Sequence, residues 1–111
     1  LNIEAMKTAS TYLLGKHDFK SFTSLKSKTK STVRTIYSID FHVVDSKIKI
    51  TYEGDGFLQH MVRILTGTLI EVGLGEKSPE EIPHILNALE RAKAGATAPA
   101  NGLCMEKVYY D

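Results

Sequence analysis

The sequence has little cysteine and no long apolar run. Cys104 is the only cysteine among 111 residues, so the chain cannot form an internal disulfide, and one thiol supplies at most half of a zinc site. A reducing compartment is therefore expected, with the cytoplasm as the default location. No apolar stretch approaches the ~18 to 20 residues that span a bilayer, and residues 1–4 have neither the basic nor the apolar region of a signal peptide. No membrane partner is expected.

Length and composition indicate one compact domain. A chain of 111 residues with 42% hydrophobic residues can bury one modest core and has little room for a second. We therefore assign residues 1–111 to a single domain. The first residue is Leu1 rather than methionine, which favours a piece of a longer protein.

Charge is distributed unevenly, although the formal net charge is only +1. Between residues 16 and 34, six basic residues stand against one acidic residue, a local net charge of +5. The candidates for contacts with nucleic-acid phosphates include Lys26, Lys28, Lys30 and Arg34. Basic side chains that neutralise phosphates release counterions, so this run is suited to nucleic-acid binding. The alternative is a solvated, lysine-rich loop, which charge alone favours.

Hydrophobic spacing predicts the first half of the secondary structure. Apolar residues at three- and four-residue spacing indicate a helix over residues 3–13, and Gly15 should end it. Residues 17–32 are expected to be irregular. Alternating apolar and polar residues predict strands over residues 33–44 and 47–53, paired as a hairpin. The residues expected on one face of the first strand are Val33, Tyr37, Ile39, Phe41 and Val43.

The second half is predicted to contain two helices and a strand. A broad apolar stripe indicates a helix over residues 57–72, which Asp55 could cap. A second helix should begin near Ser78, with Glu81 completing a capping box, and run to about residue 92. Residues 103–110 are predicted to form the last strand. This order predicts an α+β fold, an antiparallel sheet with helices on one face.

Three segments of the sequence are distinctive when taken together. They are Gly15-Lys16-His17-Asp18-Phe19-Lys20-Ser21-Phe22, then Gly56-Phe57-Leu58-Gln59-His60-Met61-Val62-Arg63 continuing through Gly67 to Glu71-Val72-Gly73, and finally the residues from Ala94 to Ala100 with Gly102-Leu103. In this order and spacing they resemble the tRNA pseudouridine synthase A family. The middle segment is the most specific of the three. The resemblance covers essentially the whole chain and implies the C-terminal subdomain of the pseudouridine synthase catalytic fold.

The resemblance implies an enzyme that converts uridine to pseudouridine in the anticodon stem-loop region of tRNA. It implies a homodimer that uses no metal and no organic cofactor. The family's nucleophilic aspartate lies in an Arg-Thr-Asp motif of the N-terminal half, and no segment of this sequence matches that motif. This chain should therefore supply one wall of the active-site cleft, bind the N-terminal half of the same enzyme, and be inactive alone.

Arg63 is the strongest candidate for an active-site residue. On the expected helix it lies close to Gln59, His60, Thr66 and Gly67. A glycine inside a helix costs about 1 kcal/mol relative to alanine, so Gly67 is expected to admit another backbone beside Arg63. By resemblance, the partner of Arg63 is the absent catalytic aspartate. The alternative is an exposed arginine on a helix flank.

The other candidates each have a plain structural explanation. His17 and Asp18 are adjacent, but neighbouring loop residues seldom face each other, so His17 is retained only as a possible RNA contact and Asp18 as a turn cap. Phe19 and Phe22 are expected to be core residues rather than base-stacking residues.

By analogy, Leu58 and Phe57 help to form an apolar wall of the uracil pocket, with a core position as the equal alternative for Leu58. His42, His60 and His84 lack the neighbouring ligands that a metal site needs, so no metal is expected. Two other functions stay open: a non-catalytic α+β RNA-binding module, and a dimerisation domain.

Overall fold

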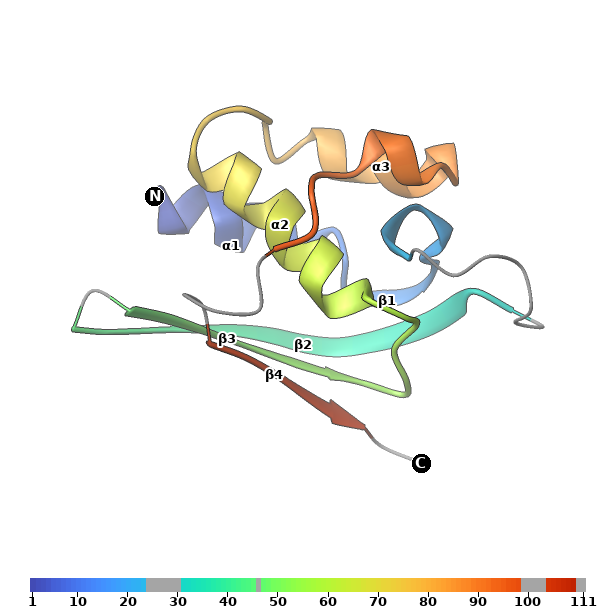
Figure 1. Cartoon of the computed structure of the whole chain (residues 1–111), viewed down its shortest axis with the longest axis horizontal. Coiled ribbons are helices and arrows are strands. Elements are labelled where there is room, and N and C mark those ends of the chain that lie inside the picture. The colour runs from blue at the N-terminus through green and yellow to red at the C-terminus, as the bar shows by residue number, and fades with distance from the viewer. Residues whose placement is uncertain (24–30, 46, 99–103, 110–111) are drawn as a thin grey trace.

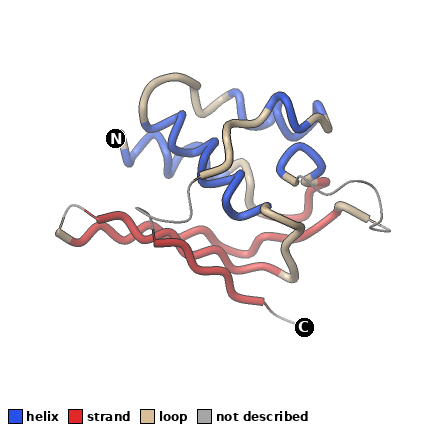
Figure 2. Tube along the Cα trace, viewed as in Figure 1, coloured by secondary structure: helices blue, strands red, loops and turns tan. Residues whose placement is uncertain are grey.

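The molecule consists of two layers, a sheet and a set of helices that covers one of its faces (Figure 1). The structure is a computed structural model and describes residues 1–23, 31–45 and 47–98, together with the backbone of residues 104–109. Figure 2 shows the strands on one side and the helices on the other. The predicted α+β class, with helices on one face of the sheet, is confirmed.

The sheet has four strands in the order β1-β2-β3-β4. These strands are β1 (Gly15–Asp18), β2 (Val33–Val44), β3 (Lys47–Gly54) and β4 (Cys104–Tyr109). The first three are antiparallel neighbours, and β2 and β3 form the predicted hairpin. β4 runs parallel to β3, so the prediction of an antiparallel sheet holds for three strands only. The chain leaves the end of β3, crosses the helical layer and returns at the start of β3, and a connection of this kind produces parallel pairing.

Strand β1 lies where the sequence indicated a loop. It is only four residues long and pairs along one edge of the sheet, from Gly15 opposite Ile36 to Asp18 opposite Val33. Gly15 has a φ of 93°, a conformation that glycine adopts at little cost, and it turns the chain from the first helix into β1. So short a strand carries too little alternation to be recognised in the sequence.

A β-bulge changes which residues of β2 face the helices. The pairing shifts between Ile36, which lies opposite Gly54, and Ser38, which lies opposite Glu53, so β2 has one extra residue at Tyr37. Ile36 is therefore buried, whereas Tyr37 is 52% exposed. The prediction that Tyr37 shares one face with Ile39 is therefore wrong. Simple alternation places Ile36 on the opposite face from Ile39, and the extra residue brings both to the same side.

The helices begin and end at residues somewhat different from those predicted. They are α1 (Ile3–Thr11), α2 (Met61–Gly73) and α3 (Glu81–Ala88), with short 3-10 turns η1 (Lys20–Phe22) and η2 (Arg91–Lys93). α2 starts four residues later than expected because His60 adopts a left-handed conformation with φ 61°. Leu89, with φ 53°, likewise ends α3 before residue 92. None of the helices in the described ranges is long and apolar enough to cross a membrane.

Helix α2 lies at the centre of the core. Its buried side chains pack against α1, against η1 and against the covered face of the sheet. Fully buried members of this core are Met6, Leu13, Phe19, Phe22, Ile36, Ile50, Tyr52, Met61, Ile64, Leu65, Leu69 and Ile82. The tyrosine hydroxyl of Tyr52 lies 2.7 Å from the hydroxyl of Thr66, and burial raises the pKa of Tyr52 well above its ordinary value. Because α2 is fixed on several sides, the residues on its remaining edge have defined positions.

Candidate functional site

Arg63 lies in the first turn of α2 and is half-buried. Its guanidinium Nε–H donates a hydrogen bond to the carbonyl of Ala98 over 2.9 Å. The backbone N–H of Ala98 in turn donates to the carbonyl of Arg63 over 3.0 Å. Two hydrogen bonds therefore join one arginine to one backbone unit of a segment 35 residues away.

Gly67 makes this approach possible. A Cβ atom at position 67 would collide with the carbonyl oxygen of Ala96, and it would lie 2.9 Å from the carbonyl carbon of Ala96 and 3.1 Å from the nitrogen of Ala98. These obstacles are backbone atoms, which cannot move aside as a flexible side chain can. The expectation that Gly67 admits a second backbone beside Arg63 is confirmed.

The segment at residues 94–98, which we call the strap, is attached to α2 at two further points. The N–H of Gly95 donates to Thr68 Oγ1 and the N–H of Ala96 donates to Glu71 Oε2, each over 2.9 Å. Figure 1 shows the strap in orange, passing beside α2 after α3. Gly95 is buried, so its N–H needs an acceptor and Thr68 supplies one, whereas the bond between Ala96 and Glu71 is exposed.

Two cations complete the surroundings of the strap. Arg91 donates to the carbonyl of Gly95 over 2.9 Å and to Thr97 Oγ1 over 3.3 Å, while Lys77 Nζ lies 3.0 Å from Glu71 Oε1. Burial of Glu71 opposes its ionisation. The hydrogen bond from Ala96 and the charges of Lys77 and Arg91 outweigh this effect, so the pKa of Glu71 is lowered below its ordinary value.

The remaining nitrogens of Arg63 are suited to an anion. A guanidinium carries five N–H donors, and the bond from Nε to Ala98 uses only one of them. Among the residues that the structure describes, no carboxylate lies within ion-pair distance of Arg63. The two Nη groups form a planar fork that can hold a carboxylate through two parallel hydrogen bonds.

The structure places Gln59 and His60 outside the helix, contrary to expectation. Both are exposed and precede α2, so the predicted strip beside Arg63 is reduced to Thr66 and Gly67. Thr66 in turn is fully buried and contacts Tyr52 rather than solvent.

Leu58 and Phe57, the residues assigned by analogy to a uracil pocket, lie in the loop between β3 and α2. Leu58 is 5% exposed and belongs to the core, while Phe57 is partly buried and packs against that core. Their contact with a base stays a prediction. Asp55 does not cap α2 as expected, because its carboxylate accepts the N–H of Thr35 over 2.9 Å.

His17 and Asp18 do not form a dyad. His17 Nε2 lies 2.7 Å from the carbonyl of Leu14, and its ring packs edge-on against Phe19. Asp18 accepts hydrogen bonds from the N–H of Lys20 and from the hydroxyl of Thr32, which confirms its role as a turn cap. Phe19 is fully buried in contact with Phe22, so the expectation that both are core residues is also confirmed.

The predicted RNA-binding residues can be placed only in part. Lys26, Lys28 and Lys30 lie outside the described residues. Arg34 is half-buried and folds back, its Nη1 donating to the carbonyls of Ser31 and Val33 over 3.0 and 2.7 Å.

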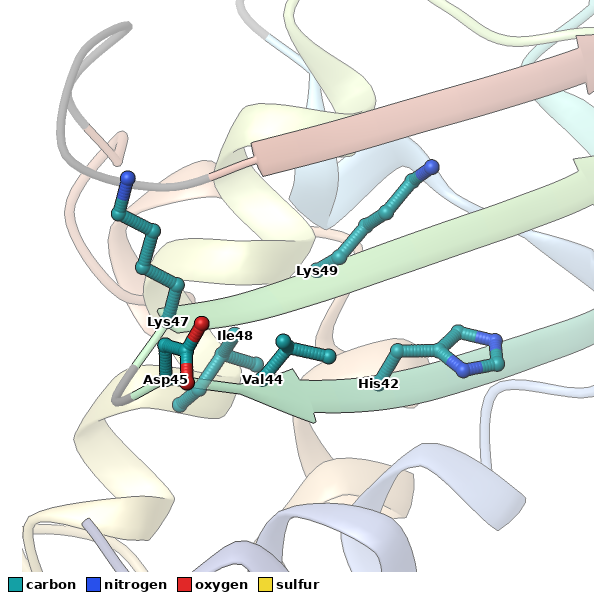
Figure 3. Close-up of a pocket in the computed structure, with 6 residues that line it drawn as sticks. All are labelled: His42, Val44, Asp45, Lys47, Ile48 and Lys49. Carbon is teal, nitrogen blue, oxygen red and sulfur yellow. The ribbon is translucent and has the colours of Figure 1, made fainter.

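Besides the basic segment from residue 16 to 34, the basic residues His42, Lys47 and Lys49 lie near the turn of the hairpin, on the face of the sheet that the helices leave uncovered. His42 pairs with Lys49 and Val44 pairs with Lys47 across β2 and β3. These four residues, with Asp45 and Ile48, line a pocket of about 260 Å³ (Figure 3). Within the described ranges, no group of three or more His, Cys, Asp or Glu side chains could hold a metal ion.

The fold and the site define an α+β domain with one uncovered sheet face and an arginine oriented by a neighbouring backbone segment. The model of the tRNA pseudouridine synthase family matches residues 9–111, so the chain belongs to this family. The resemblance inferred from the three sequence segments is thereby confirmed.

Relatives with known names agree with this assignment. A tRNA pseudouridine synthase A of Brevibacillus brevis is 47% identical over 110 residues, a match that covers 99% of this chain and 45% of that protein. Proteins with the same name from Clostridium botulinum and Bacillus subtilis are 50% and 43% identical over 112 and 111 residues, which is 99% and 100% of this chain and 45% of each relative. The chain therefore spans less than half the length of these curated relatives.

Proposed function

We propose that this chain is the C-terminal half of an enzyme that isomerises uridine to pseudouridine in the anticodon stem-loop region of tRNA. Membership of the family and the names of the relatives support this assignment. The reaction breaks the bond between N1 of uracil and C1′ of ribose and forms a bond from C5 to C1′; the C5 proton is lost to solvent and N1 takes up a proton, so the overall composition is unchanged. It is a redox-neutral isomerisation. The nucleophilic aspartate comes from the N-terminal half, which packs against this chain.

In this proposal Arg63 is the partner of that aspartate. The observation that supports it is the bond from Arg63 Nε to the carbonyl of Ala98, which leaves both Nη groups for a carboxylate. A guanidinium that contacts an aspartate favours the ionised form of the carboxyl group and holds it in one orientation. The carboxylate is then a nucleophile in a fixed position when the uridine enters.

The complete enzyme is proposed to bind its tRNA through this half as well. The tRNA lies against basic side chains of the segment from residue 16 to 34, among which Lys16 and Lys20 are exposed. The enzyme acts in the cytoplasm as a homodimer and needs no cofactor.

Arg63→Lys in the complete enzyme tests the pairing. Lysine keeps the charge but loses the planar fork, so tritium release from tRNA that carries 5-tritiated uridine should fall by about 100-fold or more. The affinity for tRNA and the melting temperature should stay close to those of the unaltered enzyme. Lys7→Arg is the control for an exchange of cations, because Lys7 is exposed on α1 and belongs neither to the strap nor to the basic segment from residue 16 to 34. Near-normal turnover of Arg63→Lys would remove Arg63 from the active site.

A further inference from the structure

The strap contacts α2 along one edge of the helix. Its attachment points are the residues that follow Arg63 by about one and two helical turns, namely Gly67, Thr68 and Glu71. Residues three and four apart on a helix are neighbours, so these positions form a continuous edge. The last residue of the strap, Ala98, then meets Arg63 at the start of that edge.

The contact with Ala98 fixes the orientation of the Arg63 guanidinium as well as its position. A guanidinium is planar, so the direction of its Nε–H determines the plane and the direction in which both Nη groups point. The carbonyl of Ala98 is held in turn by the bond from its own N–H to the carbonyl of Arg63. Any shift of the strap along α2 therefore rotates the face that Arg63 offers to an anion.

We infer that Thr68 and Glu71 are positioning residues for the isomerisation. They hold the strap so that Ala98 orients the Arg63 guanidinium toward the catalytic carboxylate. This inference rests on the proposed function, because it requires that Arg63 pairs with that carboxylate. Neither side chain contacts Arg63, and each acts through one backbone N–H of the strap.

Other observations show that the strap is fixed rather than only packed. Ala98 is 2% exposed, so burial alone would account for its position. Burial does not account for the exposed Ala96, whose N–H meets Glu71 Oε2, nor for the directed bond from the N–H of Gly95 to Thr68 Oγ1. With the two bonds between Ala98 and Arg63, these contacts determine the register of the strap against α2, and Arg91 of η2 also donates to Gly95 and Thr97.

Thr68 offers the sharper of two tests, because Thr66 is a matched control. Both threonines are fully buried on α2, and the hydroxyl of each donates to the carbonyl four residues earlier, over 2.7 Å for Thr66 and 2.9 Å for Thr68. They differ in their second partner, which is Gly95 of the strap for Thr68 and Tyr52 for Thr66. Of the two, only Thr68 binds the strap, whose residue Ala98 contacts Arg63.

In the complete enzyme, Thr68→Val removes the acceptor and keeps the shape. We expect kcat to fall by about 10- to 100-fold while KM for tRNA changes less than about threefold, because the arginine is misdirected and the RNA surface is untouched. Thr68→Ser restores the acceptor and should restore kcat. Thr66→Val should lower stability at least as much, because it leaves the buried Tyr52 hydroxyl without this partner, but it should keep kcat.

Glu71 provides a second test if Thr68→Val fails to fold. Its side chain is 21% exposed, so substitution is tolerated more easily. Glu71→Ala removes the acceptor of the Ala96 N–H, whereas Lys77→Ala removes only the ion pair to the other carboxylate oxygen. We expect kcat to fall in the first variant and to stay within about twofold of normal in the second.

The NMR signal of the Arg63 Nε–H reports directly on the hydrogen bond to Ala98, independently of turnover. It should be protected from exchange in the unaltered enzyme and in Thr66→Val, and should exchange rapidly in Thr68→Val. If both tests leave kcat unchanged while Arg63→Lys is inactive, the strap has no positioning role and the proposed function stands. If Arg63→Lys is also active, the pairing of Arg63 with the aspartate fails as well.

Discussion

Replacing Gly67 with alanine should destabilise the protein, although helix propensity alone indicates the opposite. Alanine is favoured over glycine by about 1 kcal/mol inside a helix. In this structure the added methyl group would collide with the carbonyl of Ala96 and lie 3.1 Å from the nitrogen of Ala98, so the strap must leave α2. Displacement would break the two hydrogen bonds between Ala98 and Arg63, which together contribute about 2 to 4 kcal/mol. Loss of the bonds from Gly95 and Ala96 adds to this.

The net expectation is a loss of about 2 to 6 kcal/mol in the free energy of unfolding, after the gain in propensity is subtracted. Chemical denaturation of the complete enzyme measures this, and hydrogen exchange locates it, because the N–H groups of the strap should lose protection. Gly73→Ala is the matched control on the same helix. Its added Cβ would lie 2.7 Å from Met6 Sδ, the end of a flexible side chain that can move. An equally or more stable Gly67→Ala protein with a protected strap would refute the close approach as the reason for this glycine.

Three further predictions concern acid, salt and activity. Because the pKa of Glu71 is lowered, its contribution to stability is fully present above the ordinary glutamate pKa of about 4.3 and is lost as the pH falls through the lowered value. Exchange of the Ala96 amide should therefore accelerate in acid relative to neighbouring core amides, and Glu71→Gln should abolish this dependence. Replacing Lys26, Lys28 and Lys30 with alanine should flatten the slope of log K for tRNA binding against log salt by about one unit per lost phosphate contact, whereas an unchanged slope would show that they only solvate a loop. The 111-residue chain alone should release no tritium from labelled tRNA, and release that any single aspartate substitution abolishes would contradict this.

The sequence alone was sufficient where structure depends on nearby residues. The β2–β3 hairpin follows from alternation on both sides of a short turn, and the two strands pair as predicted. Half of the predicted capping box is present, since the N–H of Ser78 donates to Glu81 Oε2 over 2.6 Å, but α3 begins at Glu81 and Ser78 is not its N-cap. The choice of Arg63 and Gly67 came from their spacing on one helix face together with the family resemblance.

The errors arose where one residue changes the local geometry. His60 delays the start of α2 by adopting a left-handed conformation, and a non-glycine residue in this conformation leaves no clear signal in the sequence. Tyr37 occupies a bulge that reverses the faces of part of β2. Both positions were read from periodicity, which assumes that each helix or strand is regular.

The contacts of Thr68, Glu71 and Arg91 with the strap could not be predicted from the sequence. Glu71 lay within a segment that resembles the family, but a helical glutamate has many possible partners. Its actual partner is a backbone N–H 25 residues away, and Arg91 reaches the same segment from the other side.

The sequence by itself determined the presence of three helices and the hairpin, because hydrophobic period, caps and turns act over a few residues. Only the tertiary structure decided that β4 runs parallel to β3 and that the strap crosses α2 at Gly67. Contacts of this kind join residues that are distant in the chain, and they form only where buried backbone donors find acceptors on an already packed helix. Their selection depends on the whole core rather than on any local pattern.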